Sequence, residues 1–258
     1  MTHTLETLDE LLAWATRERP AHSVLLERTF GDEVAAKSED RVSRRVQKSG
    51  LSEYKTLEGF DWDFQPSIDK SFVLELASLD FVHRHDDIVF TGDSGTGKSH
   101  ILKAIALRAC QQGVSMRYVR CVDLLQDLHA GLADNTYLRR LKTWVRPRLL
   151  IIDDVGLGHV RKREDEPTAA HTLYNLIDLR HSAASTAITS NIQLRDWGRY
   201  LGDASLTMAI LDRLAMHALR LDIKGPSYRQ HVARQRGLLT PLGAEESPSS
   251  TATPHEPS

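Results

Sequence analysis

Short apolar runs alternate with longer amphipathic stretches from about residue 69 onward. The apolar runs predict strands at 88–90, 116–119, 149–152, 186–189 and 218–223. Between two of these runs, Leu125, Leu128 and Leu132 recur at a spacing that places them on one helical face. Short apolar strands that alternate with helices are typical of a parallel sheet covered by helices on both faces. The pattern therefore predicts an α/β fold with a parallel five-stranded sheet.

The first 50 residues follow a helical pattern instead. Apolar positions recur at helical spacing up to Pro20, and a second helical stretch covers about 22–48 before Gly50. Residues 51–68 fit neither a helix nor a strand. The expected units are therefore a small helical N-terminal domain (1–50), a connecting arm (51–68), the α/β domain (69–236) and a tail (237–258).

Composition is that of an ordinary globular protein. The chain has 258 residues, of which 41% are hydrophobic, enough for one sizeable core. No apolar run approaches the roughly 18 residues of a membrane helix, and the acidic start does not resemble a signal peptide. Cys110 and Cys121 are too few for a disulfide framework or a zinc site. We therefore expect a cytoplasmic protein with no membrane partner, and no metal at His83 and His85.

The net charge of −2 at first argues weakly against a nucleic-acid partner. The tail, however, carries Glu245, Glu246 and Glu256 and no Lys or Arg, which leaves +1 for residues 1–236. The tail is also rich in proline and serine, which predicts disorder. The average charge thus conceals local basic patches elsewhere in the chain.

The strongest motif is GDSGTGKS at 92–99, between an apolar strand and an apolar helix. Glycines let successive backbone N–H groups face one concavity, and the helix N-terminus adds a positive dipole, so the motif predicts a phosphate-binding loop. Lys98 would bind between the β- and γ-phosphates, and Ser99 would offer its hydroxyl to Mg²⁺. The alternative is a glycine-rich turn with an incidental lysine. The predicted nucleotide-binding residues are Gly92, Asp93, Ser94, Gly95, Thr96, Gly97, Lys98, Ser99 and His100.

Two further strands are predicted to end in polar side chains. LLIIDD at 149–154 has the form of a Walker B motif, in which Asp153 would hold Mg²⁺ and Asp154 would orient the attacking water. Asn191 after TAITS would contact that water or the γ-phosphate, the role called sensor 1. The alternatives are a solvated acidic turn and a turn-forming asparagine.

Arg213 lies on a predicted helix in the run ILDRL. The side chain either pairs with Asp212 or another neighbour, or projects into the nucleotide of an adjacent subunit as an arginine finger. Spacing alone leaves both readings open.

With these motifs, the chain resembles the IstB-like transposition helper ATPases, a branch of the AAA+ superfamily close to the DnaC helicase loaders. The resemblance covers about residues 5–235 and includes KTLEGFDW, LLIIDDVGLG, AILDRL and GPSYR. It implies an αβα P-loop NTPase core of the AAA+ type with a helical N-terminal domain. It also implies a catalytic site made of Lys98, Asp154, Asn191 and a trans-acting Arg213, with Arg229 of GPSYR contacting nucleotide.

The resemblance further implies the activity and the partners. Such proteins are DNA-dependent ATPases that use ATP and Mg²⁺ and oligomerise on double-stranded DNA with composite ATP sites. They assist a partner transposase of the IstA type in target-site selection and insertion. The alternatives are a DnaC-like helicase loader, an ATP-binding switch or scaffold without turnover, and a small-molecule kinase.

The chain departs from the family pattern in three places. Asp93 and Ser94, after the first P-loop glycine, stand where the family usually has two prolines or similar residues. Asp154 stands where many members carry Glu. A charged stretch at 161–166 is longer than expected.

Two basic clusters without acids are candidates for DNA contact, because phosphate neutralisation needs local charge density and not a positive average. They are Arg139, Arg140, Lys142, Arg146 and Arg148, and Arg41, Arg44, Arg45 and Lys48. The alternative for the first is a solvated helix face, and the second could equally face an acidic protein surface. We expect contact with the DNA backbone and not with the bases.

Overall fold

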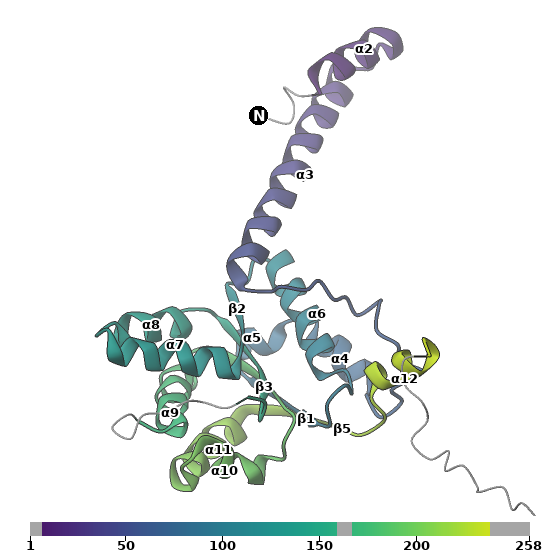
Figure 1. Cartoon of the computed structure of the whole chain (residues 1–258). Coiled ribbons are helices and arrows are strands. Elements are labelled where there is room, and N and C mark those ends of the chain that lie inside the picture. Colours follow the sequence, from purple (N-terminus) through teal and green to yellow (C-terminus); the bar gives the residue numbers. More distant parts are fainter. Residues whose placement is uncertain (1–6, 159–166, 238–258) are drawn as a thin grey trace, which may run out of the picture.

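The computed structural model describes residues 7–158 and 167–237. Among these residues, the arm is preceded by the helices α2 (Leu8–Glu18) and α3 (His22–Ser49). Pro20 separates them, and Gly50 ends α3 in the left-handed conformation with φ 81°. The long helix α3 projects away from the sheet and carries α2 at its far end (Figure 1). The helical prediction for this region is confirmed, whereas the expected tail beyond residue 237 and the charged stretch 161–166 lie outside the described residues.

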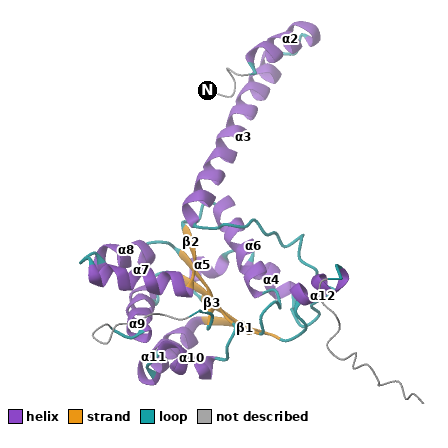
Figure 2. Ribbon diagram, viewed as in Figure 1, coloured by secondary structure: helices purple, strands orange, loops and turns teal. Residues whose placement is uncertain are grey.

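All five predicted strands are present and form one parallel sheet (Figure 2). They are β1 (Asp87–Gly92), β2 (Met116–Arg120), β3 (Leu149–Val155), β4 (Ser185–Ser190) and β5 (Ala218–Ile223). Their order in the sheet is β2-β3-β4-β1-β5, so β1 lies between β4 and β5 and has parallel partners on both sides. The predicted parallel five-stranded sheet is confirmed.

Helices cover both faces of this sheet. The remaining elements are α4 (Lys70–Leu76), α5 (Asp80–Arg84), α6 (Lys98–Gln111), α7 (Cys121–Ala133), α8 (Tyr137–Val145), α9 (Ala169–Arg180), η1 (Leu194–Asp196), α10 (Trp197–Leu201), α11 (Ala204–His217) and α12 (Tyr228–Gln235). Alternate strand residues divide between two cores, because successive side chains of a strand point to opposite faces. Ile151 packs with α4, α5 and α6, whereas Ile152 packs with α7 to α11. The result is an αβα sandwich.

The parallel strands bring three functional segments to one edge of the sheet. Thr91 of β1 pairs with Ser190 of β4, and Ser190 pairs with Val155 of β3. The register between β3 and β4 shifts between Ile152 and Val155, at the position of the two predicted Walker B acids. Ligands of open α/β sheets bind beyond these carboxyl ends. Within the described part of the chain, no helix is long and apolar enough to cross a membrane.

Candidate nucleotide site and nucleic-acid interface

The glycine-rich loop joins β1 directly to α6. Gly95 and Gly97 adopt φ of 88° and 102°, a region that side chains with a Cβ rarely enter. A Cβ at Gly95 would lie 2.1 Å from Ser227 Oγ, and one at Gly97 would lie 2.7 Å from the Phe60 ring. Both glycines are therefore required by backbone conformation and by close neighbours, and the N-terminus of α6 faces the loop.

Lys98 is buried under this loop, with 3% of its surface exposed. Its Nζ donates to the carbonyl oxygens of Gly92 and Asp93, both at 2.7 Å. Burial lowers the pKa of Lys98, and the carboxylates of Asp154, Asp153 and Asp93 act in the opposite direction. The ammonium is thus held as a compact positive charge inside the phosphate cradle.

Asp153 is buried at the end of β3 and accepts three hydroxyl hydrogen bonds. Ser99 Oγ donates to its Oδ1 at 2.8 Å, and Thr189 Oγ1 donates to the same oxygen. The hydroxyl of Tyr118 on β2 donates to Oδ2. The predicted partners Ser99 and Asp153 therefore meet, although 54 residues separate them.

Asp154 and Asn191 meet beside this pair. Asp154 adopts φ 63°, in the left-handed region that residues with a Cβ rarely enter. Asn191 Nδ2 donates to Asp154 Oδ1 at 2.9 Å, and the Asp154 N–H donates to Thr189 Oγ1 at 2.8 Å. Thr189 thus connects the two acids, donating to one and accepting from the other.

The connecting arm and the GPSYR segment pack against the P-loop and against each other. Gln65 of the arm is 2% exposed and donates from Nε2 to the carbonyl of Pro226 at 3.0 Å. Phe64 meets Tyr228 edge to face, with ring centroids 5.2 Å apart. Arg229 donates to Ser94 Oγ at 3.2 Å. Two segments that are distant in the sequence are therefore fastened together over the P-loop.

A cleft of about 520 Å³ lies between these elements. Ten predicted residues line it: Gly95, Thr96, Gly97, Lys98, Ser99, His100, Asp153, Asp154, Asn191 and Arg229. Gly92, Asp93 and Ser94 form the start of the loop and do not line the cleft. Sequence reasoning assigned no role to the lining residues Phe60, Phe64 and Tyr228. The aromatic run GFDWDF is the sequence signal that could have indicated them.

His100 helps to fix the arm. Its ring meets Phe60 edge-on at 5.2 Å between centroids, and Nε2 lies 2.9 Å from the carbonyl oxygen of Thr56. Burial lowers the pKa of His100, so the neutral ring with a proton on Nε2 is the form that fits this contact.

The donor set at this edge suits a magnesium ion that is carried with nucleotide. Mg²⁺ prefers oxygen ligands and is usually held by one or two carboxylates together with substrate phosphates. Ser99 and Asp153 supply a hydroxyl and a carboxylate beside the phosphate cradle. Within residues 7–158 and 167–237, no group of three or more His, Cys, Asp or Glu side chains is arranged to hold a metal.

Arg213 lies on α11 and contacts residues of its own chain. Its Nε donates to Asp178 Oδ1 at 2.7 Å, and its Nη2 donates to the Tyr174 hydroxyl at 2.6 Å. The guanidinium carbon also lies 4.5 Å from the centre of the Tyr174 ring. Within the chain, Arg213 therefore forms an ion pair, with Asp178 as the partner and not Asp212. The role across a subunit boundary stays a prediction.

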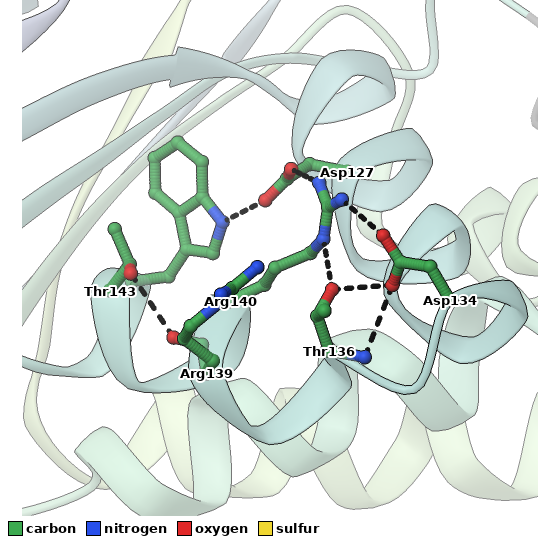
Figure 3. Close-up of polar contacts among 7 residues, drawn as sticks. Asp127, Asp134, Thr136, Arg139, Arg140 and Thr143 are labelled. Carbon is green, nitrogen blue, oxygen red and sulfur yellow. Dashed lines mark hydrogen bonds and ion pairs between the residues drawn. The ribbon is translucent and has the colours of Figure 1, made fainter.

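The basic cluster around α8 separates into paired and free cations, and Figure 3 shows the contacts of the paired residue Arg140. Arg140 donates to Asp127 at 2.5 Å, to Asp134 at 2.8 Å and to Thr136 at 2.8 Å. The Thr136 and Arg140 hydrogen bonds lower the pKa of Asp134 to about 2. Two carboxylates therefore neutralise Arg140, which makes this cation part of the α7–α8 packing.

The other cations of this cluster are arranged differently. Arg148 donates to His83 Nδ1 at 3.3 Å. Arg139, Lys142 and Arg146 are exposed and, together with Thr143, line a shallow hollow of about 340 Å³. No ion pair joins these three cations to another residue in the described part of the chain. We call these three residues the α8 cationic face.

The cluster on α3 is less uniform. Arg44 pairs with Asp40 at 3.4 Å, and Arg45 donates to the carbonyl of Cys110 at 3.5 Å. Arg41 and Lys48 are exposed on the same helix.

The sequence matches the family of the IstB-like ATP binding protein over residues 1–236. The chain belongs to this family. A protein of insertion sequence IS232 from Bacillus thuringiensis subsp. berliner, described as ATP-binding, is 35% identical over 76% of this chain and 77% of its own length. The corresponding protein of insertion sequence IS21 from Pseudomonas aeruginosa is 33% identical over 93% of this chain and 89% of its own length.

This IstB-like chain also shares its fold with solved structures. DnaA from Aquifex aeolicus with bound AMPPCP has a TM-score of 0.55 at 17% identity, covering 76% of this chain and 58% of that chain. DnaI has a TM-score of 0.53 at 20% identity, covering 69% and 90%. At these identities the similarity shows the fold alone, which is that of an AAA+ P-loop NTPase. The expected family and fold are thus confirmed.

Proposed function

We propose that this protein is an ATP hydrolase that oligomerises on double-stranded DNA and assists a transposase in target-site selection and DNA insertion. One observation carries the hydrolytic part: Asp154 and Asn191 share a hydrogen bond of 2.9 Å beside the part-buried Ser99–Asp153 pair. A protein that only binds nucleotide needs the cradle and the metal ligands but not a second, oriented carboxylate.

Each residue of the site has a distinct proposed task. The P-loop N–H groups and Lys98 bind the phosphates, while Ser99 and Asp153 hold Mg²⁺. The ion would supply charge neutralisation on the phosphate oxygens as the bond to the leaving group breaks. Asp154 orients the attacking water and polarises it, and Asn191 fixes the carboxylate that does so. Arg229 extends from its contact with Ser94 toward the phosphates.

The α8 cationic face supports the DNA-binding part of the proposal. Unpaired cations release condensed counterions when they meet phosphates, whereas a cation already neutralised by two carboxylates gains little. Arg139, Lys142 and Arg146 therefore contact the DNA backbone, and Arg140 does not. Arg41 and Lys48 on α3 are secondary candidates, and an acidic protein surface remains their alternative partner.

The relatives support a transposase as the protein partner. The proteins of IS232 and IS21 are named as components of insertion sequences, in which DNA movement requires a transposase. The alternative is a helicase loader, because the AAA+ core is shared with DnaI. A pull-down with the tagged full chain separates the two, since recovery of a replicative helicase in place of a transposase would contradict the proposal.

Two substitutions test the division of roles in the cleft. Lys98→Ala should lose nucleotide binding, because it removes a buried charge on the phosphates. Asp154→Asn should bind ATP with unchanged affinity and release phosphate at least about 100-fold more slowly, the range expected for a lost general base. Equal binding defects in both variants would contradict these roles. Unchanged phosphate release by Asp154→Asn would contradict its role with the attacking water, and no phosphate release by the wild-type protein would favour the switch or scaffold alternative.

A further inference from the structure

Tyr118 lies outside every motif discussed above and contacts the site through a single atom. It is the central residue of β2, where it is paired with Ile151 of β3. Its ring packs in the core between the sheet and α6, with 8% of the residue exposed. Its hydroxyl donates to Asp153 Oδ2.

This hydroxyl completes the set of donors around the Asp153 carboxylate. Ser99 and Thr189 both donate to Oδ1, so Tyr118 holds the oxygen that those two residues leave open. Two of these donors, Tyr118 and Thr189, belong to strands on either side of β3. With both oxygens held, the carboxylate cannot rotate about its terminal bond without breaking a hydrogen bond.

Tyr118 has close neighbours at its backbone and at its ring. A Cβ at Gly50, where α3 ends, would lie 2.7 Å from the Tyr118 carbonyl oxygen, so helix and strand are in close contact. Lys103 Nζ lies 5.7 Å from the ring centre and pairs with Glu53 of the arm at 2.8 Å. A donor held in this way is pre-organised for one acceptor position.

We propose that Tyr118 is a positioning residue of the magnesium–nucleotide site, which acts by fixing Asp153 in the orientation that meets the ion. This inference rests on the proposed function, because it assumes that Mg²⁺ is bound with the nucleotide. Groups that hydrogen-bond a metal-ligating carboxylate orient it, and their loss typically weakens metal affinity by about 10- to 100-fold. Tyr118 touches neither nucleotide nor water in this role, so its effect passes entirely through Asp153.

Tyr118→Phe in the full chain tests the inference, because it removes the hydroxyl and keeps the packed ring. The measurement is binding of a fluorescent ADP analogue, titrated with Mg²⁺ and repeated in EDTA. We expect the variant to need about 10-fold more Mg²⁺ for half-maximal binding, while its affinity in EDTA stays that of the wild type. Thr189→Val, which removes the hydroxyl on the other oxygen, should shift the Mg²⁺ requirement in the same direction. Tyr137→Phe on α8 is the matched control and should leave the Mg²⁺ requirement unchanged.

The outcomes are separable. An unchanged or lower Mg²⁺ requirement in Tyr118→Phe, beside a wild type that depends on Mg²⁺, overturns the inference alone. An equal loss of affinity with Mg²⁺ and in EDTA also overturns it, because a purely structural role would produce that result. A wild-type protein whose nucleotide binding ignores Mg²⁺ overturns both this inference and the magnesium site of the proposed function.

Discussion

Asn191 Nδ2 donates a hydrogen bond of 2.9 Å to Asp154 Oδ1, across the edge where β3 and β4 end. The two residues are 37 positions apart and are brought together only because β3 and β4 are parallel neighbours. The contact restrains the Asp154 carboxylate.

Asn191→Ala should slow ATP hydrolysis and leave ATP binding almost unchanged. A hydrogen bond to a charged group contributes about 1.5–3 kcal/mol, which corresponds to a turnover roughly 10- to 100-fold lower if the bond acts in the transition state. Phosphate release and equilibrium binding should be measured on the same preparation. Asn175→Ala, which removes an amide on α9 that contacts the Tyr137 hydroxyl, is the control. A variant that loses affinity and turnover in parallel would contradict the assignment.

Replacing Arg139, Lys142 and Arg146 by Ala together should weaken DNA binding and flatten its salt dependence. Each lost phosphate contact removes about 0.9 from the slope of log K against log salt, so the slope should fall by up to about 2.7. The loss should be the same for unrelated duplex sequences, because backbone contacts carry no sequence information.

A charge-matched control keeps this test specific. Three exposed cations elsewhere on the surface that, like the α8 cations, have no ion pair in the described part of the chain, Arg19, Arg199 and Arg220, can be replaced by Ala together. If the control flattens the slope as much as the α8 variant does, overall charge and not the α8 cationic face governs the binding.

Arg213 should act on the nucleotide of a neighbouring subunit. Arg213→Ala alone should lose turnover by about 1,000-fold or more, as expected for a lost arginine finger. Mixing it with Lys98→Ala should restore part of the activity, because a mixed assembly joins an intact P-loop to an intact finger. Absence of any recovery in mixtures that still assemble would contradict the role in trans and leave the Asp178 ion pair as the function of Arg213.

Arg180 should be among the residues most important for stability. It is 1% exposed and donates to the carbonyls of Trp144, Val145 and Pro147, to the carbonyl of Ser185 and to the hydroxyl of Thr186. Arg180→Ala would leave these buried acceptors without a partner and should lower the free energy of unfolding by about 3–5 kcal/mol.

Urea denaturation gives the measurement for Arg180. Arg199→Ala, at an exposed position of α10, should change stability by less than about 0.5 kcal/mol. A loss below about 1 kcal/mol in Arg180→Ala would contradict the assigned role.

The sequence predicted the parts of the site that depend on local pattern. The P-loop, the strand that ends in Asp153 and Asp154 and the strand before Asn191 follow from apolar runs and adjacent polar residues. The parallel sheet then places these strand ends at one edge, so the meeting of Ser99 with Asp153 follows from the fold class.

Other features depend on tertiary neighbours that no local pattern encodes. Arg140 belongs to the same basic run as Arg139, and only the packing of α8 against α7 shows that Asp127 neutralises it. In the sequence, Tyr118 is one more residue of a predicted apolar strand. Only the pairing of β2 with β3 brings its hydroxyl to Asp153. The pairing of Arg213 with Asp178 likewise requires α11 to pack on α9.

The most direct test of the central claim is the rate of ATP hydrolysis by the full chain, measured with and without duplex DNA over a range of protein concentrations. Composite sites that assemble on DNA predict that turnover per subunit rises with protein concentration, and that duplex DNA raises it further and shifts the rise to lower concentrations. The triple alanine variant of the α8 cationic face should keep the basal rate of ATP hydrolysis and lose the stimulation by DNA. A turnover per subunit that is the same with and without DNA at every concentration would contradict the account.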